Sequence, residues 1–257
     1  MRITILGCGS SGGVPLIGCQ CSVCVSDNPK NRRSRVSVLV EAEDINLLID
    51  SSPDLRQQAL RHDIRRIDAV LYTHDHADHT GGLDDLRSFN YLSNDAIPVY
   101  SNDDTIQRIQ KRFAYAFLPR PDGTIWYRPC LTPHVIPDGN QHFTVSGIPV
   151  TAFEQRHAKT KTLGYRIGNF SYSTDVNVLP EEAFDALQGT EVWVVDCLRY
   201  TKSLSHSDLE NTLAWIGRVR PKLAVLTHMA HEFDYDVLSK ELPPGVVPGY
   251  DGMVIDL

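Results

Sequence analysis

The stretch Thr73-His74-Asp75-His76-Ala77-Asp78-His79 places three imidazoles and two carboxylates within seven residues. It follows the apolar run Ala69-Val70-Leu71-Tyr72, which predicts a short buried strand that ends where the polar residues begin. Because side chains two residues apart in extended backbone share a face, His74 and His76 are expected to reach one metal ion. The pair Asp78-His79 offers ligands to a second ion. Such crowding of neutral and anionic ligands favours a metal-binding turn over a solvated polar loop.

The length and composition of the chain suit one large α/β domain with an ample core, since it has 257 residues of which 42% are hydrophobic. The net charge of -7 argues against a nucleic-acid binder with a broad basic surface, although it leaves a small charged substrate open. No apolar run approaches a membrane span, and the N-terminus lacks a basic region followed by an apolar core. We therefore expect a single domain over residues 1–257, located in the cytoplasm and without a membrane partner.

The segment Gly18-Cys19-Gln20-Cys21-Ser22-Val23-Cys24 carries three of the six cysteines. Without a secretory signal a disulfide framework is not expected, and the Cys-x-x-Cys spacing of the last two thiols is typical of a zinc knuckle, here at residues 18–24. A redox role is the alternative, but no strand-to-helix context surrounds the pair and a third thiol is left over. Because a structural zinc is normally four-coordinate, we expect a His or Cys from elsewhere to complete the site.

Three further candidate ligands follow predicted strands later in the chain. They are His157 after the strand Ile148 to Phe153, Asp175 after the strand Asn169 to Tyr172, and His228 after the strand Leu223 to Leu226. Each alone is equally compatible with a structural histidine or a helix cap. Together with the turn at residues 73–79 they make four strand-end metal motifs.

The pattern His-x-His-x-Asp-His, followed by His, Asp and His at later strand ends, resembles the signature of the metallo-β-lactamase superfamily. The resemblance implies an α/β fold of the αββα sandwich type, in which two mixed sheets pack face to face, helices cover the outside and the metals lie at the edge of the sheets. It implies a dinuclear centre with one metal held by His74, His76 and His157, the other held by Asp78, His79 and His228, and Asp175 bridging the two. Asp50, after the predicted strand Asn46 to Ile49, would orient the metal loop from behind the ligands.

A dinuclear centre would supply its own nucleophile. Two cations that share a hydroxide lower the pKa of its parent water, so that neither a serine nor a cysteine is needed at neutral pH. A set of only His and Asp ligands with a bridging carboxylate fits phosphoester cleavage better than β-lactam cleavage. Such sets accept several divalent ions according to availability, and we expect manganese or zinc at the two catalytic positions.

Four further motifs indicate which family within this superfamily the chain resembles. They are Gly-x-Gly-x-x-Gly-Gly-Val-Pro at residues 7–15, Gly-Cys-x-Cys-x-x-Cys at residues 18–24, Thr-His-x-x-His at residues 227–231 and Tyr-Asp-Gly-Met at residues 250–253. Over nearly the whole chain they resemble the PhnP family of phosphodiesterases of the carbon-phosphorus lyase pathway. The resemblance implies that His231 completes the structural zinc site with Cys19, Cys21 and Cys24. It also implies catalytic roles for Asp78, at the metals, and for His206, as the general acid that protonates the leaving alkoxide.

The expected function is that of a metal-dependent phosphodiesterase acting on small cyclic phosphates, such as phosphoribosyl cyclic phosphate or nucleoside 2′,3′-cyclic phosphates. Lys159 and Lys161 are candidates for binding a second phosphate of such a substrate. Between Pro119 and Pro137, five prolines predict an irregular loop or lid near the substrate.

Three alternative functions stay open. A tRNA 3′-processing nuclease would share the metal centre, but the chain shows no inserted basic arm to clamp a long RNA, and extended nucleic acid is not an expected partner. Thioester or lactone hydrolysis is the second alternative. The third is a non-catalytic carrier of the PqqB type, against which the intact ligands at all seven predicted positions argue. A homodimer is left open.

Overall fold

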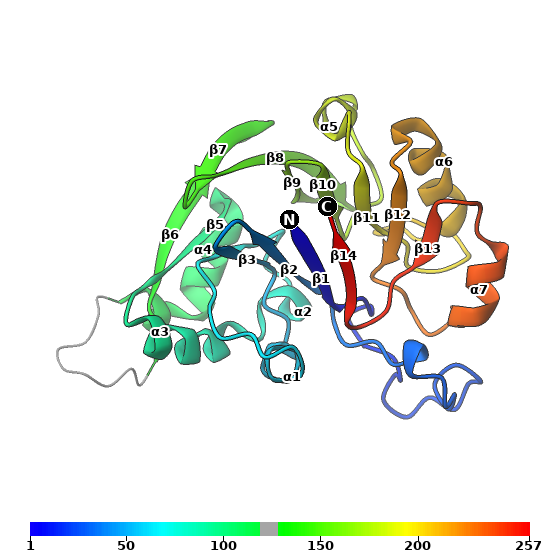
Figure 1. The fold of residues 1–257 in the computed structure, drawn as a ribbon, viewed down its shortest axis with the longest axis horizontal. Coiled ribbons are helices and arrows are strands. Elements are labelled where there is room, and N and C mark those ends of the chain that lie inside the picture. The colour runs from blue at the N-terminus through cyan, green and yellow to red at the C-terminus, as the bar shows by residue number, and fades with distance from the viewer. Residues whose placement is uncertain (119–127) are drawn as a thin grey trace.

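Two facing β-sheets with helices on their outer sides form the fold (Figure 1). The structure is a computed structural model that describes residues 1–118 and 128–257. Each sheet has seven strands, in the order β14-β1-β2-β3-β4-β5-β6 for the first and β13-β12-β11-β10-β9-β8-β7 for the second. Both contain parallel and antiparallel pairs. This arrangement confirms the predicted αββα sandwich of two mixed sheets.

The bounds of the elements are as follows. The first sheet contains β1 (Arg2–Gly7), β2 (Ser37–Ala42), β3 (Ile45–Ile49), β4 (Ala69–Leu71), β5 (Ile97–Asn102), β6 (Leu131–Ile136) and β14 (Met253–Asp256). The second contains β7 (Gln141–Val145), β8 (Ile148–His157), β9 (Thr160–Ile167), β10 (Phe170–Ser173), β11 (Val192–Asp196), β12 (Leu223–Thr227) and β13 (Val246–Pro248). The α-helices are α1 (Leu55–Arg61), α2 (Ala77–Thr80), α3 (Arg87–Ser93), α4 (Asp103–Arg112), α5 (Glu181–Leu187), α6 (Leu209–Val219) and α7 (Tyr235–Glu241). The 3-10 helices are η1 (Pro29–Asn31), η2 (Leu83–Leu86) and η3 (Ala114–Phe117).

The central strands of the first sheet are largely apolar on both faces because each face has its own core. In β1, Ile3 and Ile5 belong to the core between the sheets, whereas Leu6 packs with the core beneath the helices. In β3, Leu47 and Leu48 divide between the same two cores. Alternate side chains of a strand point to opposite faces, so a strand buried on both sides reads as a continuous apolar run.

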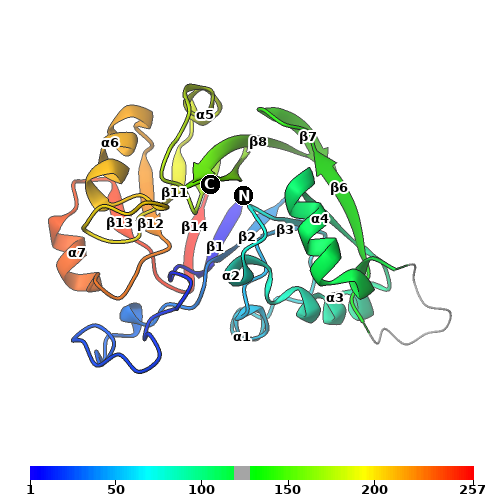
Figure 2. The same cartoon turned by 180° about the vertical axis from the view of Figure 1, so that it is seen from behind.

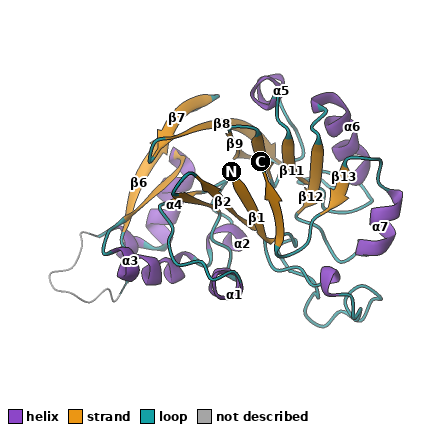
Figure 3. Ribbon diagram, viewed as in Figure 1, coloured by secondary structure: helices purple, strands orange, loops and turns teal. Residues whose placement is uncertain are grey.

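Helices cover the outer face of each sheet. Helices α1, α3 and α4 lie along the first sheet, and α5, α6 and α7 lie beside the second, as seen from both sides (Figures 1 and 2). The purple helices therefore flank the orange strands on the outside of the sandwich (Figure 3). No helix of the described residues is long and apolar enough to cross a membrane.

The carboxyl ends of the strands gather at one edge of the sandwich. Strands β3, β4 and β5 run parallel in the first sheet, and β10, β11 and β12 run parallel in the second. The sheets are tied there by hydrogen bonds from Leu163 N to Thr73 O (2.9 Å) and from the Tyr165 hydroxyl to Tyr72 O (2.7 Å). Polar residues that follow these strands therefore meet between the two sheets.

The predicted irregular loop between Pro119 and Pro137 is wrong for its last part. Leu131–Ile136 forms β6, which pairs parallel with β5 at the edge of the first sheet. An edge strand tolerates Pro133, because a proline there need not donate to a neighbour on its open side. The part of the predicted lid at residues 119–127 lies outside the described residues.

Candidate metal centre

Asp50 holds the loop that follows β4. Its Oδ1 accepts a hydrogen bond from Thr73 N (2.8 Å), and its Oδ2 accepts from Thr73 Oγ1 (2.8 Å) and lies 2.7 Å from His79 Nδ1. The carboxylate is fully buried. Because it accepts the Nδ1 proton of His79, it fixes the tautomer that leaves the Nε2 lone pair free for a metal. Asp50 therefore contacts the loop that it was predicted to orient, and its role toward the metals stays a prediction.

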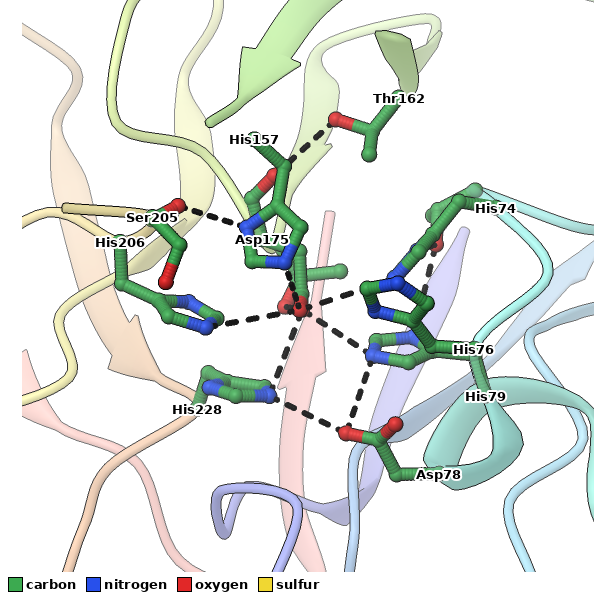
Figure 4. Close-up of polar contacts among 12 residues, drawn as sticks. His74, His76, Asp78, His79, His157, Thr162, Asp175, Ser205, His206 and His228 are labelled. Atoms are coloured by element: carbon green, nitrogen blue, oxygen red, sulfur yellow. Dashed lines mark hydrogen bonds and ion pairs between the residues drawn. The ribbon is translucent and has the colours of Figure 1, made fainter. Parts of the chain in front are cut away.

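The two oxygens of Asp175 face two different groups of side chains (Figure 4). Oδ2 lies 3.7 Å from His74 Nε2 and 3.8 Å from His157 Nε2. Oδ1 lies 3.1 Å from His79 Nε2 and 3.4 Å from His228 Nε2. Two groups of ligand atoms therefore share this carboxylate, namely His74, His76, His157 and Asp175 in one group and Asp78, His79, Asp175 and His228 in the other.

These two groups fit divalent cations. The Nε2 atoms of His74, His79 and His228 are buried and make no hydrogen bond within the described part of the chain. Two ligands of one tetrahedral ion lie about 3.3–3.8 Å apart when each is about 2.0–2.3 Å from the metal. The separations in the second group match, with Asp78 Oδ2 at 3.4 Å from His79 Nε2 and at 3.5 Å from His228 Nε2. Buried nitrogens with free lone pairs around ionised oxygens are the donor set of a metal centre.

Three residues of the site have left-handed backbone. The φ angles are 60° at Asp50, 50° at Asp175 and 56° at His228. This region is uncommon for residues other than glycine and costs free energy, about 1–3 kcal/mol for each residue, so it persists only where surrounding structure enforces it. Asp50 and His228 come directly after β3 and β12, and Asp175 comes two residues after the end of β10, so the left-handed turns lie at strand ends.

Electrostatics keep the two carboxylates of the site ionised. Burial opposes ionisation of Asp175, but its interactions with His228, His79 and His74 hold the pKa of this carboxyl well below its usual value. The pKa of Asp78 is likewise lowered, since contacts with His228 and His79 outweigh its burial. Burial and the neighbouring His79 hold the pKa of His74 well below its usual value, which favours the neutral imidazole. Burial also lowers the pKa of His79, but Asp175 and Asp50 raise it well above its usual value. Because metals bind neutral imidazoles and anionic carboxylates, a metal at His79 would displace a proton.

His206 lies beside this centre. Its Nε2 is 3.8 Å from Asp175 Oδ2, and its ring stacks on that of His228 with centroids 4.6 Å apart. Its Nδ1 is 3.2 Å from Asp196 Oδ2. Burial lowers the pKa of His206, but the charge of Asp196 and the hydrogen bond to it raise this pKa to about 9. The loop that carries His206 is fixed at the metal centre, because His157 Nδ1 donates to Ser205 O at 2.6 Å.

The zinc knuckle has its predicted fourth partner beside it. Cys19, Cys21, Cys24 and His231 bring their ligand atoms within 4.8 Å of one another. His231 Nδ1 is 3.5 Å from Cys19 Sγ and 3.4 Å from Cys21 Sγ. Thiolate and imidazole ligands of one tetrahedral zinc lie about 3.5 Å apart, so this cluster fits a closed structural site. The contact with His231 also lowers the pKa of Cys21 to about 6, which favours the thiolate.

Comparison with known proteins agrees with the site. A family model described as "Beta-lactamase superfamily domain" matches residues 45–229. The crystal structure of a diphosphatase from the PhnP family is similar at a TM-score of 0.91 and 33% identity, covering 100% of this chain and 97% of that one. The chain belongs to the metallo-β-lactamase superfamily and, within it, to the PhnP family.

Two other relatives show how far this likeness extends. This PhnP-family chain is 37% identical over 257 residues to a protein of Porphyromonas gingivalis named octanoyltransferase, and the match covers 98% of the chain but 51% of that protein. The chain thus spans about half the length of that relative. The zinc-bound PqqB of Methylobacterium extorquens, at 21% identity and a TM-score of 0.80 with 100% of both chains covered, shares the fold. Family membership and the His/Asp clusters together support a metal-dependent hydrolase.

The two predicted substrate lysines lie on and next to β9. Lys161 Nζ is 3.1 Å from Asp138 Oδ2 and 3.3 Å from Glu154 Oε1 on the exposed side of β9. These carboxylates would compete with a substrate phosphate for its charge, and the role of Lys161 in binding substrate stays a prediction. Lys159 is exposed in the turn between β8 and β9, two residues after His157, and its role stays a prediction.

Asp196 is the site residue that the sequence analysis did not single out. It ends β11, is fully buried, and accepts hydrogen bonds from Ser207 N (3.1 Å) and Val176 N (3.2 Å) in addition to its contact with His206. Its Oδ1 lies 3.9 Å from His228 Nδ1. The available signal was a carboxylate at the end of an apolar strand, the same pattern that drew attention to Asp50.

Proposed function

We propose that the chain is a two-metal phosphodiesterase that hydrolyses small phosphate esters, cyclic diesters among them. The observation that carries the proposal is the division of the Asp175 carboxylate between two groups of ligand atoms, with His206 placed beside both. The likeness to a PhnP-family diphosphatase over the whole chain supports phosphorus esters as the substrate class.

The residues that would hold the cations are those of the two groups. One ion would lie between His74, His76, His157 and Asp175, and the other between Asp78, His79, His228 and Asp175. Bound there, two divalent cations would lower the pKa of a water molecule and offset the negative charge of a phosphate. Asp50 and the Ser205 carbonyl would keep His79 and His157 in the tautomer that binds metal, through their Nδ1 protons.

His206 would protonate the leaving group. When water opens a phosphodiester, a P–O bond to the alcohol breaks, and the departing oxygen needs a proton unless it is a stable anion. His206 Nε2 lies 3.8 Å from Asp175 Oδ2, so its proton would be close to a substrate held by both groups. Asp196 orients the ring through Nδ1 and would stabilise its protonated form.

The relative from Porphyromonas gingivalis favours a second candidate. That protein is named octanoyltransferase, and this chain matches about half of it. If the matched half acts on the same kind of compound as the named activity, its substrate would carry an octanoyl group, and the same centre would then attack a carbonyl carbon. Thioester hydrolysis was already open from the sequence.

A substrate screen distinguishes the candidates. Purified protein, assayed with manganese or zinc, should be compared on nucleoside 2′,3′-cyclic phosphates, a linear nitrophenyl phosphodiester, an octanoyl thioester, a lactone and a tRNA precursor. We expect the highest kcat/KM on a small cyclic phosphodiester. A preference for the octanoyl thioester would replace this proposal by the second candidate, and activity confined to the tRNA precursor would favour the nuclease. Absence of turnover on every compound, with metals bound, would favour the carrier.

A further inference from the structure

Arg33 is a buried cation without a carboxylate partner. Its exposed fraction is 1%. The guanidinium donates to backbone carbonyls, with Nη1 3.0 Å from Ala230 O and Nη2 bonded to Phe233 O, and Nη2 lies 3.2 Å from Asn31 Oδ1. Within the described residues, no Asp or Glu oxygen lies within 4 Å of its nitrogens, and Nε has no hydrogen-bond partner. Arginine stays charged even when buried, so a compensating negative charge is expected nearby.

The surroundings of Arg33 belong to the zinc knuckle. Its backbone pairs with Val14, with both N–O distances at 2.8 Å. Val14 packs with Val23 and Cys24, and Cys19 and Cys21 border the same cluster. On its other side, the two carbonyls that Arg33 binds flank His231 in sequence. Arg33 therefore contacts the segment that carries the histidine ligand and lies against the loop that carries the thiol ligands.

The knuckle would place a negative charge near Arg33 when it holds zinc. A divalent ion bound by three thiolates and a neutral imidazole has a net charge of about -1. Asp251 and Asp234 are two other acidic groups near Arg33; they accept hydrogen bonds from Ser34 and Asn31, which are neutral, so both carboxylates keep their charge. Within the described residues neither forms an ion pair with the guanidinium, whereas the chain around Arg33 packs directly against the thiol cluster through Val14. The zinc-bound thiolates would therefore add a buried negative charge beside Arg33.

We propose that Arg33 is the counter-charge of the zinc site formed by Cys19, Cys21, Cys24 and His231, and that it positions the segment carrying His231. The alternative is a neutral brace, in which only the hydrogen bonds to Ala230 O and Phe233 O matter. The two accounts differ in what a lysine at this position does. A lysine keeps the charge but loses most of the hydrogen bonds, because it lacks the planar fork of donors. This inference concerns the knuckle and stands apart from the proposed phosphodiesterase activity.

Zinc affinity measured by chelator competition on the full-length protein tests the proposal. Partners that support metal ligands typically contribute 10- to 100-fold in affinity, and we expect Arg33→Met to weaken zinc binding by roughly that factor. Arg33→Lys should stay within about threefold of the wild type, because the charge remains. Arg166→Met is the matched control, since Arg166 also donates to backbone carbonyls, at Gly168 and Ala186, but lies outside the knuckle. It should leave zinc affinity unchanged.

A double-mutant cycle isolates the charge. Cys19→His would convert the site to two thiolates and two imidazoles, which with zinc is neutral. In the Cys19→His protein, Arg33→Met should lower zinc affinity by less than about threefold. The effects of the two substitutions on zinc affinity would therefore be strongly non-additive. If Arg33→Met alone does not fold, the proposal requires that the double variant, which also carries Cys19→His, folds and binds zinc. Equal losses of zinc affinity for Arg33→Lys and Arg33→Met, or additive losses in the cycle, would overturn the counter-charge proposal. The neutral brace would then be the better account.

Discussion

Asp196 links the general-acid candidate to a metal-ligand candidate. Its Oδ2 lies 3.2 Å from His206 Nδ1, while its Oδ1 faces His228 Nδ1 at 3.9 Å. The rings of His206 and His228 are stacked with an interplanar angle of 14°. One buried carboxylate therefore contacts His206 directly and faces His228, a candidate metal ligand, without a hydrogen bond to it. This arrangement gives separate, measurable roles to His206 and Asp196.

Replacing His206 by alanine should slow hydrolysis of a cyclic phosphodiester by about 10²- to 10⁴-fold, the usual contribution of a general acid. The loss should be much smaller for a nitrophenyl ester, whose leaving anion is stable without a proton. Metal content should stay normal, since His206 belongs to neither shared ligand group. His142→Ala, at an exposed histidine that contacts Thr151, serves as the control. Equal losses on both ester types would indicate a role in substrate positioning instead.

The effect of Asp196→Asn should follow that of His206→Ala. An asparagine keeps the size of the side chain but cannot stabilise a protonated imidazole, so we expect a loss of about 10- to 100-fold on the cyclic diester, with the same leaving-group dependence. Because Asp196 acts through His206, the double variant should be no slower than His206→Ala alone. Additive losses in kcat would show that Asp196 acts independently of His206.

Substituting Asp50 should lower metal affinity more than it lowers kcat. Asp50→Asn keeps an acceptor for Thr73 but weakens the contact that fixes the His79 tautomer, and such partners contribute roughly 10- to 100-fold to metal affinity. We expect kcat at saturating manganese to fall less than the affinity for manganese, as measured by titration of activity. The variant Asp68→Asn, at a carboxylate that is 22% exposed and paired with Arg66, should match the wild type. Unchanged manganese affinity would contradict the assigned role of Asp50.

The knuckle and the dinuclear centre should respond to different substitutions. Cys21→Ser should remove the knuckle zinc and lower the melting temperature, on the order of 10 °C, because a structural zinc contributes folding free energy. Cys130→Ser, outside the cluster, should keep the zinc. Elemental analysis and thermal unfolding of the same samples check both outcomes. Unchanged zinc content and stability in Cys21→Ser would mean that these thiols do not form a structural site.

Much of the fold followed from the sequence because strands buried on both faces are short apolar runs. The ligands that follow β4, β8, β10 and β12 could be located because each comes at or just after the end of such a run. The structure brings them together as the predicted order requires. His231 was predicted through the family resemblance alone, and the structure brings it to the three thiols.

The rest depended on contacts between distant parts of the chain. Arg33 is 197 residues from Ala230, so nothing in the run Asn31-Arg32-Arg33-Ser34-Arg35 distinguishes a buried arginine from its solvated neighbours. Asp196 has the same local pattern as many helix-capping carboxylates. Strand β6 was missed because prolines predict irregular structure, and only its position at the sheet edge makes Pro133 acceptable. Local sequence carries no information on which strand is at an edge.

Titration of the metal-depleted catalytic centre with manganese, followed by the hydrolysis of a nucleoside 2′,3′-cyclic phosphate, tests the central claim most directly. Mild chelation should leave the knuckle zinc in place, and activity should return as manganese is added and saturate at about two ions per chain. Asp175→Ala should retain the knuckle zinc yet show no activity at any manganese concentration, because the shared carboxylate is gone. Full activity after chelation, activity that saturates at one ion, or an active Asp175→Ala protein would contradict a two-metal phosphodiesterase built on Asp175.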